Sequence, residues 1–284
     1  MTPRRVAILG LGLMGGSLGL ALRGLGDPPL VVGFDPGTGV SSRARERGAV
    51  DSIAGDPADA VAGADLAVLA APPRAASGLI GVIEPRLEAG AAVADLSSVM
   101  RPLRALLAGS PSLLRRVVSS HPLCGSERDG IEAARADLYQ GRTILVGADE
   151  SAREAADRVS ALWRAVGAVP KPIDPRAHDA LLALTSHLPL LGSVALARAL
   201  RRSGRPAAAL AEASGPGLRD ATRLSGSLPA LWEEILSLNA EEVIPALRIL
   251  EEETALLRRA LEARSPELRA LLEEARAFRA GLAR

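Results

Sequence analysis

The chain is poor in several residue types that would point to particular classes of protein. It has one cysteine, Cys124, among 284 residues. A single cysteine excludes an internal disulfide and is typical of a protein of the reducing cytoplasm. The 34 basic and 33 acidic side chains leave a net charge of +1, so no overall field attracts the chain to nucleic acid or to a membrane surface. We therefore expect a cytoplasmic protein with no nucleic-acid partner and no membrane partner.

Metal-binding and membrane-spanning patterns are missing as well. The three histidines lack the spacing of metal ligands and no cysteine pairs are present, so we predict no metal site. The apolar stretch at residues 180–200 is interrupted by polar residues, a proline and an arginine. It therefore predicts a buried helix of a soluble protein and not a membrane span.

A glycine-rich turn near the N-terminus is the most informative feature that the chain does have. Residues 6–9 predict a buried strand, and they run into a G-x-G-x-x-G motif, Gly10-Leu11-Gly12-Leu13-Met14-Gly15. In a dinucleotide site the first glycine makes the tight turn, the second lets the pyrophosphate approach, and the third lets helix and strand pack closely. The helix N-terminus then offers N–H groups and a positive dipole end to the phosphates. We predict that these six residues bind a nicotinamide dinucleotide.

An acidic residue follows the second predicted strand, residues 30–34. Asp35 comes 25 residues after Gly10, close to the offset of about 20 at which an acidic side chain reaches a ribose 2′-hydroxyl. Its carboxylate would repel a 2′-phosphate, and no arginine follows it directly, although Arg43 or Arg45 could fold back. We therefore expect NAD, not NADP, as the cofactor. The alternative to a dinucleotide site is a glycine-rich turn that arises by chance and binds no cofactor.

The first half of the chain alternates strand-like runs with helical segments. Further strands are predicted at residues 65–71, 91–95, 116–120 and 143–147. This alternation predicts an α/β fold with an N-terminal, Rossmann-type, doubly wound parallel sheet. Ligands of such sheets lie beyond the carboxyl ends of the strands. Ala71 and Pro72, which end the third predicted strand, are therefore candidate cofactor contacts.

The second half has a different texture. Three prolines within residues 170–175 end the α/β pattern and predict a stiff linker, and from residue 177 onward only helical periodicity is present. We expect a dinucleotide-binding domain at residues 1–172 and an all-helical substrate-binding and dimerisation domain at residues 173–284. A helical half with several apolar faces commonly buries some of them against another subunit, so we expect a homodimer through this half.

Two candidate catalytic side chains follow strands of the predicted sheet. His121 comes directly after the fifth strand, where Pro122 holds it extended, and histidine is the side chain best suited to exchange a proton near neutral pH. The alternative is an ordinary loop histidine. Ser98 follows the fourth strand, where its hydroxyl would orient a base or touch the nicotinamide, or where the segment is simply a helix cap.

The helical half adds polar candidates of its own. His187 stands just before a proline in an apolar helix, so it must face a partner or a cavity. Arg219 and Arg223 follow a glycine-rich turn, and arginine suits bidentate carboxylate binding. For either one alone, the alternative is a surface charge, as expected in a chain so rich in arginine. Trp232 is one of only five aromatic residues, and it belongs either to the core or to the lining of a pocket.

Five segments together resemble the prephenate and arogenate dehydrogenases, the dehydrogenases of tyrosine biosynthesis. They are residues 10–18, 95–99, 121–127, 186–189 and 217–223, the last followed by Trp232. The glycines of the first segment are generic, whereas the His-Pro-Leu-Cys-Gly-Ser-Glu and Arg-Asp-Ala-Thr-Arg segments are specific. The resemblance implies NAD-dependent oxidative decarboxylation of a cyclohexadienol. Hydride leaves ring C4 for the nicotinamide, the C4 hydroxyl loses its proton, and carbon dioxide departs as the ring becomes aromatic.

The resemblance also implies roles for site residues. His121 would be the base on the C4 hydroxyl, and Ser98 would orient His121 and the cofactor. Arg223 would bind a substrate carboxylate, His187 would contact the substrate side chain, and Trp232 would line the pocket. The other implied substrate-binding residues are Ser126, at a position of small hydroxyl residues, and Glu127 and Asp220, at or near the entrance.

The chain departs from the family pattern at two informative positions. Met100 stands where a lysine is usual, and Leu190 stands where a second histidine often follows. The change at Leu190 leaves the identity of the substrate open. We expect prephenate, and the alternatives are arogenate alone or both compounds. A β-hydroxyacid dehydrogenase would need a lysine in the helical half, but the only lysine is Lys171. A non-catalytic NAD(H)-sensing protein would leave the polar candidates without a role.

Overall fold

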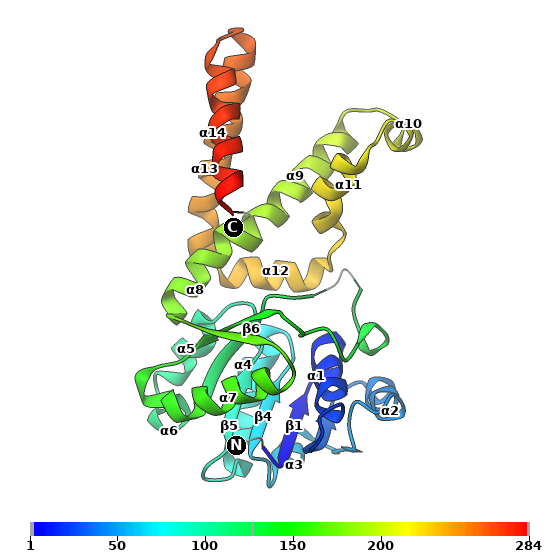
Figure 1. The fold of residues 1–284 in the computed structure, drawn as a ribbon, viewed down its shortest axis with the longest axis vertical. Helices are drawn as coiled ribbons and strands as arrows, with labels where there is room; N and C mark the ends of the chain where they lie inside the picture. Colours follow the sequence, from blue (N-terminus) through cyan, green and yellow to red (C-terminus); the bar gives the residue numbers. More distant parts are fainter. Residues whose placement is uncertain (1–2, 126–127, 283–284) are drawn as a thin grey trace.

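A computed structural model describes residues 3–125 and 128–282 of the chain. Eight strands form one sheet in the order β3-β2-β1-β4-β5-β6-β7-β8, with a helical region beyond one end of it (Figure 1). The strands are β1 (Arg5–Leu9), β2 (Leu30–Phe34), β3 (Ser52–Ile53), β4 (Leu66–Leu69), β5 (Ala92–Asp95), β6 (Val117–Pro122), β7 (Thr143–Gly147) and β8 (Val169–Ile173).

Helices cover both faces of the sheet because each face presents buried apolar side chains. The helices of this half are α1 (Leu13–Arg23), α2 (Thr38–Glu46), α3 (Pro57–Val61), α4 (Pro73–Ile83), α5 (Arg101–Leu107), α6 (Pro111–Leu114) and α7 (Arg153–Ala165). One apolar cluster joins the sheet to α1 and α7, with Leu18 and Trp163 fully buried. A second cluster on the other face includes Ile80 of α4 and Leu103 of α5. The predicted doubly wound α/β architecture is confirmed.

The predicted strands agree closely with the observed ones, with two omissions and one difference in direction. Sequence reasoning missed the two-residue β3 and the whole of β8. Strand β7 runs antiparallel to β6, with His121 opposite Leu145, whereas the other neighbouring pairs are parallel. The sheet is therefore mostly, not entirely, parallel.

The proline-rich segment is a strand and not the linker that its composition suggested. Residues Val169–Ile173 pair in parallel with β7, with Pro170 opposite Ile144 and Pro172 opposite Val146. Because β8 is the last strand in the sheet order, one side of it has no strand neighbour, and prolines at alternate positions direct their missing N–H groups to that side. The expected division into residues 1–172 and 173–284 stays a prediction.

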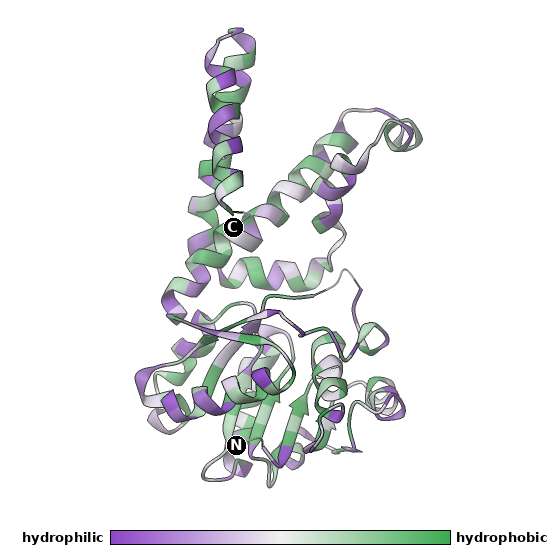
Figure 2. Cartoon of the chain, in the orientation of Figure 1, coloured by the Kyte–Doolittle hydropathy of each residue, from purple (hydrophilic) through white to green (hydrophobic). Residues whose placement is uncertain are grey.

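The second half is helical throughout, and its long elements diverge from one another (Figure 1). Its α-helices are α8 (Pro175–Leu182), α9 (Leu188–Arg202), α10 (Ala207–Glu212), α11 (Pro216–Thr222), α12 (Pro229–Leu238), α13 (Ala240–Glu262) and α14 (Glu267–Leu282). Helices α13 and α14 lie side by side and form what we call the arm. Figure 2 shows hydrophobic residues along the arm as well as in the strands.

The prediction of a buried helix at residues 180–200 is wrong for the single chain. Residues Pro175–Arg202 form a helical stretch that is long and apolar enough to cross a membrane by length and composition, yet only 28% of its most apolar window is buried. A π-helical turn at Ala183–His187 joins α8 to α9, just before Pro189, whose missing N–H interrupts the regular hydrogen bonds. This turn ends at His187.

Candidate functional site

The glycine-rich turn has the geometry that its sequence predicts. Gly10 has φ +100°, and a Cβ there would lie 2.4 Å from the carbonyl oxygen of Ala70. A Cβ on Gly15 would lie 1.9 Å from the oxygen of Gly10, so close packing excludes any side chain there. A Cβ on Gly12, in contrast, would meet no protein atom within 4 Å. The space above Gly12 is therefore open for a ligand to approach the backbone.

The N-terminus of α1 suits an anionic group. Its N-cap is Gly12, which has no side chain to cap the helix, and the first turn carries no acidic residue. The first N–H groups of a helix have no intrahelical partner, and together with the dipole they favour a phosphate. The turn therefore fits the pyrophosphate of a dinucleotide, and the cofactor contacts of Leu11, Leu13 and Met14 stay predictions. Ala71 and Pro72 lie next to this turn, between β4 and α4.

Asp35 is fastened to the same turn. One carboxylate oxygen accepts a hydrogen bond from the Leu11 N–H and the other from the Gly37 N–H, each at 2.9 Å. The nearby Arg43 is already paired, because its guanidinium donates to Glu132 at 2.6 Å and to Glu46 at 3.1 Å. The hydrogen bond to Glu132 is the main cause that raises the pKa of Arg43. Asp35 thus holds the turn at the end of β2, where a ribose would lie.

His121 lies near the carboxyl end of β6, three strand spacings from β1 along the sheet. At about 4.8 Å a spacing this is roughly 14 Å. Its Nδ1 is 2.9 Å from Nε2 of His178, and within the described residues its Nε2 forms no hydrogen bond. Burial, together with positive charge on His178 and His187, lowers the pKa of His121 to about 3. His121 is therefore neutral at physiological pH and has one ring nitrogen free to meet a ligand.

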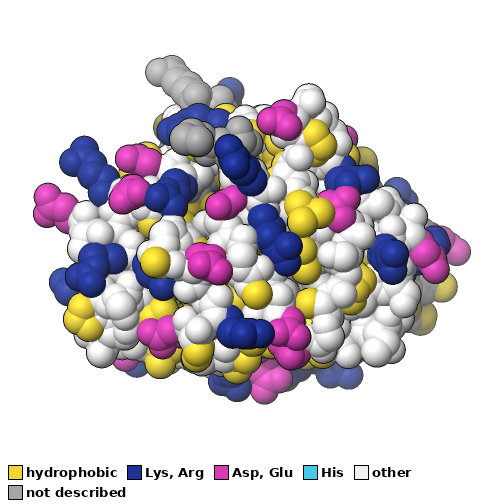
Figure 3. All heavy atoms as spheres, turned by 90° about the horizontal axis from the view of Figure 1, so that it is seen from below, with side chains coloured by type: hydrophobic (Ala, Val, Ile, Leu, Met, Phe, Trp, Pro, Cys, Tyr) yellow, Lys and Arg dark blue, Asp and Glu magenta, His cyan; other side chains and the backbone are white. Residues whose placement is uncertain are grey.

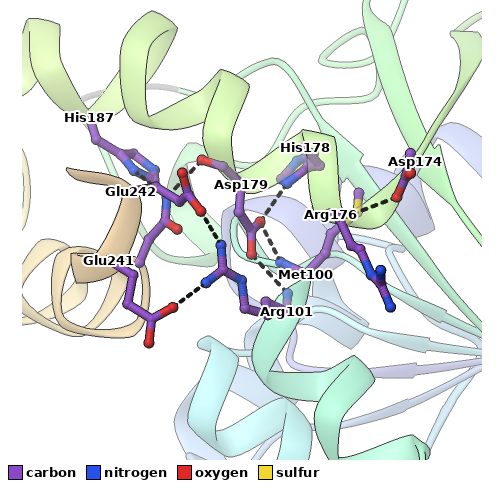
Figure 4. Close-up of polar contacts among 10 residues, drawn as sticks. Met100, Arg101, Asp174, Arg176, His178, Asp179, His187, Glu241 and Glu242 are labelled. Carbon is purple, nitrogen blue, oxygen red and sulfur yellow. Dashed lines mark hydrogen bonds and ion pairs between the residues drawn. The ribbon is translucent and has the colours of Figure 1, made fainter. Parts of the chain in front are cut away.

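The partner of His121 belongs to a pair on α8 that sequence reasoning missed. His178 and Asp179 are both fully buried, and Nδ1 of His178 is 2.7 Å from Oδ1 of Asp179. The Asp179 carboxylate also accepts the backbone N–H groups of Met100 and Arg101, each at 2.9 Å (Figure 4). Burial acts to raise the pKa of Asp179, but these three hydrogen bonds outweigh it and hold the pKa below its ordinary value. Asp179 is therefore a carboxylate.

A second buried histidine lies on the other side of this pair. His187 is 1% exposed, and its Nδ1 is 3.1 Å from Nδ2 of Asn239. The same Nδ2 donates to the backbone oxygen of Asp179 at 2.9 Å, and the His187 ring meets Trp232 edge-on with centroids 5.8 Å apart. Burial lowers the pKa of His187 to about 4. Asn239 thus ties His187 to the His178–Asp179 pair.

Ion pairs and hydrogen bonds fasten the helical half over this end of the sheet. The guanidinium of Arg101, at the start of α5, contacts Glu241 and Glu242 of α13 (Figure 4). The N–H of Arg74, in α4, donates to Glu234 of α12 at 2.7 Å. The site is consequently built at a junction, with β6 and the segment before α5 on one side and α8, α12 and α13 on the other.

The segment after β5 carries a second buried acid. Asp95 is fully buried, and one of its oxygens accepts from the Ser97 hydroxyl at 2.6 Å while the other has no partner among the residues described. Burial raises the pKa of Asp95 to about 6, against the effect of the Ser97 hydrogen bonds. Ser98 follows in the same segment, and it forms no side-chain hydrogen bond in the described part of the chain. Its predicted contact with His121 therefore stays a prediction.

The predicted site residues fall into three groups. His121, His187 and Trp232 are brought into one connected cluster. Asp220 and Arg223 lie exposed on α11 and the 3₁₀ turn after it, and within residues 3–125 and 128–282 no hydrogen bond joins them to the cluster. The turn that begins at Arg223 packs on α9, where Ser225 N–H donates to Ser193 at 3.0 Å. Ser193 is six residues beyond His187, or roughly 9 Å along a helix. Ser126 and Glu127 lie outside the described residues.

The residues that sequence reasoning missed left a weak signal. Asp179 is an acidic side chain directly before a long apolar stretch, and such a residue is buried only when it is paired. Asn239 is the only asparagine of the chain, but nothing in its neighbours marks it as a bridge. A bridge of this kind joins residues about 60 positions apart, and periodicity along the sequence does not reveal such contacts.

Other hollows and charges on the molecule do not compete with this site. A cavity of about 800 Å³ beside α7 and β8 is lined by none of the predicted site residues. Among the residues described, no group of three or more His, Cys, Asp and Glu side chains could hold a metal ion. On the face opposite the helical half, basic and acidic side chains are interspersed (Figure 3), so that face presents no patch of one sign.

Comparison with protein-family models identifies both halves of the chain. Residues 18–171 match the model described as "Prephenate dehydrogenase, nucleotide-binding domain", and residues 174–274 match "Prephenate dehydrogenase, dimerization domain". A cyclohexadienyl dehydrogenase of Zymomonas mobilis is 32% identical over 252 residues, which cover 86% of this chain and 84% of that protein.

Solved structures agree with these matches. A prephenate dehydrogenase from Aquifex aeolicus, in complex with hydroxyphenyl propionate and NAD+, is 28% identical with a TM-score of 0.89, covering 99% of each chain. An arogenate dehydrogenase from Synechocystis has a TM-score of 0.79 at 24% identity, covering 98% of this chain and 99% of that one. At this low identity, the similarity to the Synechocystis protein shows a shared fold.

Proposed function

The chain belongs to the prephenate dehydrogenase family of NAD-dependent oxidoreductases, and we propose that it oxidatively decarboxylates prephenate at the junction of its two halves. The observation that carries the proposal is the place of His121. Its free ring nitrogen lies at the carboxyl edge of the sheet, on the side that the helical half covers, and the open Gly12 turn lies along the same edge. A base and a dinucleotide turn on one edge are what this reaction requires.

The cofactor residues that we propose are those of the turn and the strand ends beside it. The pyrophosphate would lie on the backbone of Gly10, Gly12 and the start of α1, and Asp35 would face the adenosine ribose. Ala71, Pro72 and Ser98 lie further along the edge, toward His121. When bound, NAD+ supplies the acceptor for the hydride that leaves ring C4.

The chain's own residues then have to hold the substrate and one proton. Nε2 of His121 would accept the proton of the C4 hydroxyl as that oxygen develops carbonyl character, and would return it to the phenolate oxygen once carbon dioxide has left and the ring is aromatic. General-base help of this kind contributes ~10²–10⁴-fold. The neutral state of His121 at physiological pH, which follows from its lowered pKa of about 3, leaves its lone pair available.

The substrate's carboxylates and side chain would be held by the helical half. Arg223 would bind one carboxylate, His187 would contact the side chain, and Trp232 would line the pocket beside it. The proposed roles of Ser126, Glu127 and Asp220 are contacts near the entrance.

Prephenate and arogenate differ in the substrate side chain, where this chain carries Leu190 in α9. Leu190 is 3% exposed and presents no polar group. His187 is therefore left as the polar side chain that would distinguish the keto group of prephenate from the amino group of arogenate. The Zymomonas relative is named a cyclohexadienyl dehydrogenase, which favours turnover of both substrates as the second candidate function.

We also propose that the active form is a homodimer in the cytoplasm. The helical half matches a model named for dimerisation, and several large apolar side chains of the arm are exposed, Phe278 by 70% and Leu261 by 61%. A second copy that covers these faces, and the apolar surface of α9, would give the stretch at residues 175–202 a protein environment in place of a membrane.

One spectrophotometric assay tests the proposed function. Purified protein is mixed with NAD+ and either prephenate, arogenate or a simple β-hydroxyacid, and NADH absorbance is followed. We expect NADH with prephenate, with or without activity on arogenate, and none with β-hydroxyacids. Activity on β-hydroxyacids alone, or on none of the three, would refute the proposal. Equal turnover with NADP+ would refute the preference for NAD.

A further inference from the structure

We propose that His178 and Asp179 are a positioning pair that keeps the proton of His121 on Nδ1 and its lone pair on Nε2. This inference deepens the proposed function and rests on it. The three side chains form an unbroken line from a buried carboxylate to the ring nitrogen that would meet the substrate.

The fixed end is the Asp179 carboxylate, which can only accept hydrogen bonds. Nδ1 of His178, 2.7 Å away, must therefore carry a proton and donate it. In a neutral imidazole the other nitrogen is then an acceptor. Nε2 of His178 is 2.9 Å from Nδ1 of His121, so Nδ1 of His121 is the donor in that contact. The remaining nitrogen of His121, Nε2, is left as a lone pair.

The same line stabilises the cation that forms when His121 takes a proton. Burial disfavours charge on His121, and the lowered pKa of about 3 expresses this. A protonated His121 would still donate through Nδ1 to His178, which in turn donates to a carboxylate, and Asp179 acts to raise the pKa of His121. An orienting acid behind a histidine base plays the same two roles in serine proteases.

Asp179 also positions a second part of the site. Its carboxylate binds the N–H groups of Met100 and Arg101 at 2.9 Å each, directly after the segment that carries Ser98. One side chain of the helical half thus holds both the segment expected near the nicotinamide and the support of the base. Its backbone oxygen fixes the amide of Asn239 with Nδ2 inward, so that Nδ2 donates to Nδ1 of His187 and leaves the His187 proton on Nε2.

The test exchanges the carboxylate for an amide of the same shape. In Asp179→Asn the amide oxygen is expected at the Oδ1 site, where His178 Nδ1 and the Met100 N–H both donate, and the amide nitrogen then faces the Arg101 N–H. The tautomers of His178 and His121 are kept, but the negative charge that stabilises a protonated His121 is lost. We expect kcat to fall by ~10²–10³-fold, with KM and the affinity for NAD+ changed by less than about threefold.

Nuclear magnetic resonance reads the proton positions without any substrate. The chain has only three histidines, so ¹⁵N-histidine labelling gives a spectrum of three rings, assigned by single substitutions. We expect Nδ1–H for His121 and His178 and Nε2–H for His187 in the wild type. In Asp179→Asn we expect the same tautomers, because the amide oxygen still accepts from Nδ1 of His178. This readout separates a positioning role from a merely structural one.

Two further variants calibrate the result. Asp174→Asn makes the same chemical change on the same helix, at the N-cap that accepts from Arg176 N–H at 2.8 Å, and should leave kcat and all three tautomers as in the wild type. In His178→Gln the amide oxygen can accept from Nδ1 of His121 but passes no contact to the carboxylate. We expect the His121 tautomer to be kept and kcat to fall ~10–100-fold, less than in Asp179→Asn. If Asp179→Asn does not fold, His178→Gln and the wild-type spectrum still decide.

The outcomes are distinct. Wild-type kcat in Asp179→Asn, or Nε2–H on His121 in the wild type, would each overturn the positioning role. If the wild type forms no NADH from prephenate or arogenate, the proposed function fails, whereas the histidine spectrum still reports whether the pair sets the tautomer.

Discussion

The two halves of the chain bury their apolar side chains to very different extents. The sheet half closes its own core, with Ile8, Leu22 and Trp163 among many fully buried side chains on the two faces of the sheet. In the helical half α14 has no buried residue at all within its described length, and α13 buries only Val243, Ala246 and Ala260. In a layered domain the helices bury their apolar faces against the sheet. A diverging set of amphipathic helices, in contrast, leaves apolar faces exposed that only another surface can cover.

The junction between these halves carries the chemistry, and its loss has the largest expected effect. In His121→Asn we expect kcat to fall by ~10²–10⁴-fold, since the amide cannot act as a base. The affinity for NAD+, measured by fluorescence titration, should stay nearly unchanged because the glycine turn lies three strands away. NADH absorbance gives kcat, and wild-type turnover would remove His121 from the mechanism.

The junction should also make the fold sensitive to acid. The pKa values of His121 and His187 are lowered to about 3 and about 4, whereas an unfolded histidine titrates near 6.5. Below pH 6.5 the unfolded chain therefore binds protons that the folded chain refuses, and stability falls as the pH falls through this range. These two groups contribute a slope of up to ~2.7 kcal/mol per pH unit, with Asp179 adding to the loss below about pH 3.9. Asp95, whose pKa is raised to about 6, opposes this slope by up to ~1.4 kcal/mol per pH unit between about pH 6 and 3.9, because its folded carboxyl binds a proton that the unfolded one does not.

Urea unfolding between pH 7.5 and 5 measures this slope. Replacing one of the two groups, in His187→Gln, should reduce the slope by ~1.4 kcal/mol per pH unit. A free energy of unfolding that is constant over this range would show that the junction is not closed in solution.

Within the sheet half, two glycines of one motif should behave in opposite ways. Gly15→Ala forces a Cβ to within 1.9 Å of a backbone oxygen, and we expect the free energy of unfolding to fall by about 2–3 kcal/mol. Gly12→Ala meets no protein atom within 4 Å, so thermal unfolding should change little while the affinity for NAD+ falls. A thermal scan and a titration of each variant separate packing from ligand approach. Equal effects of the two substitutions on both measurements would contradict the assignment.

In the helical half, the last predicted change concerns association. Leu261→Ser removes an apolar side chain that is 61% exposed on the arm, and burial of such a side chain against a second copy is worth about 1.5–2 kcal/mol for each of the two copies. We expect the dimer to dissociate at roughly 10²–10³-fold higher concentration in light scattering. Val82→Ser, at 48% exposure on α4, is the matched control and should leave the dimer unchanged. A monomeric wild type would refute the proposed dimer.

The sequence predicts the first half better than the second, for a physical reason. Strands β2 and β7 have the bounds that their apolar runs predict, residues 30–34 and 143–147. A buried strand can be predicted in this way because it is a local pattern bounded by turn residues. Strand β8 was missed because its prolines disfavour a strand everywhere except at an edge, and which strand lies at the edge is decided by tertiary structure.

The site shows the same division. His121 and the glycine turn are recognisable because their place after a strand is a local property. The support of His121 by His178, and the bridge from Asn239 to His187, join segments 57 and 52 residues apart and depend on how the helical half lies over the sheet. Substrate contacts of Arg223 depend on that arrangement as well and stay proposals.

The measurement that bears most directly on this account is a crystal structure of the protein with NAD+ and a phenol that carries a carboxylate on its side chain. We predict that the phenol oxygen lies within hydrogen-bond distance of His121 Nε2 while the carboxylate lies against the guanidinium of Arg223. A ligand that reaches only one of the two groups, with the other turned to a separate cavity, would contradict a single site at the junction.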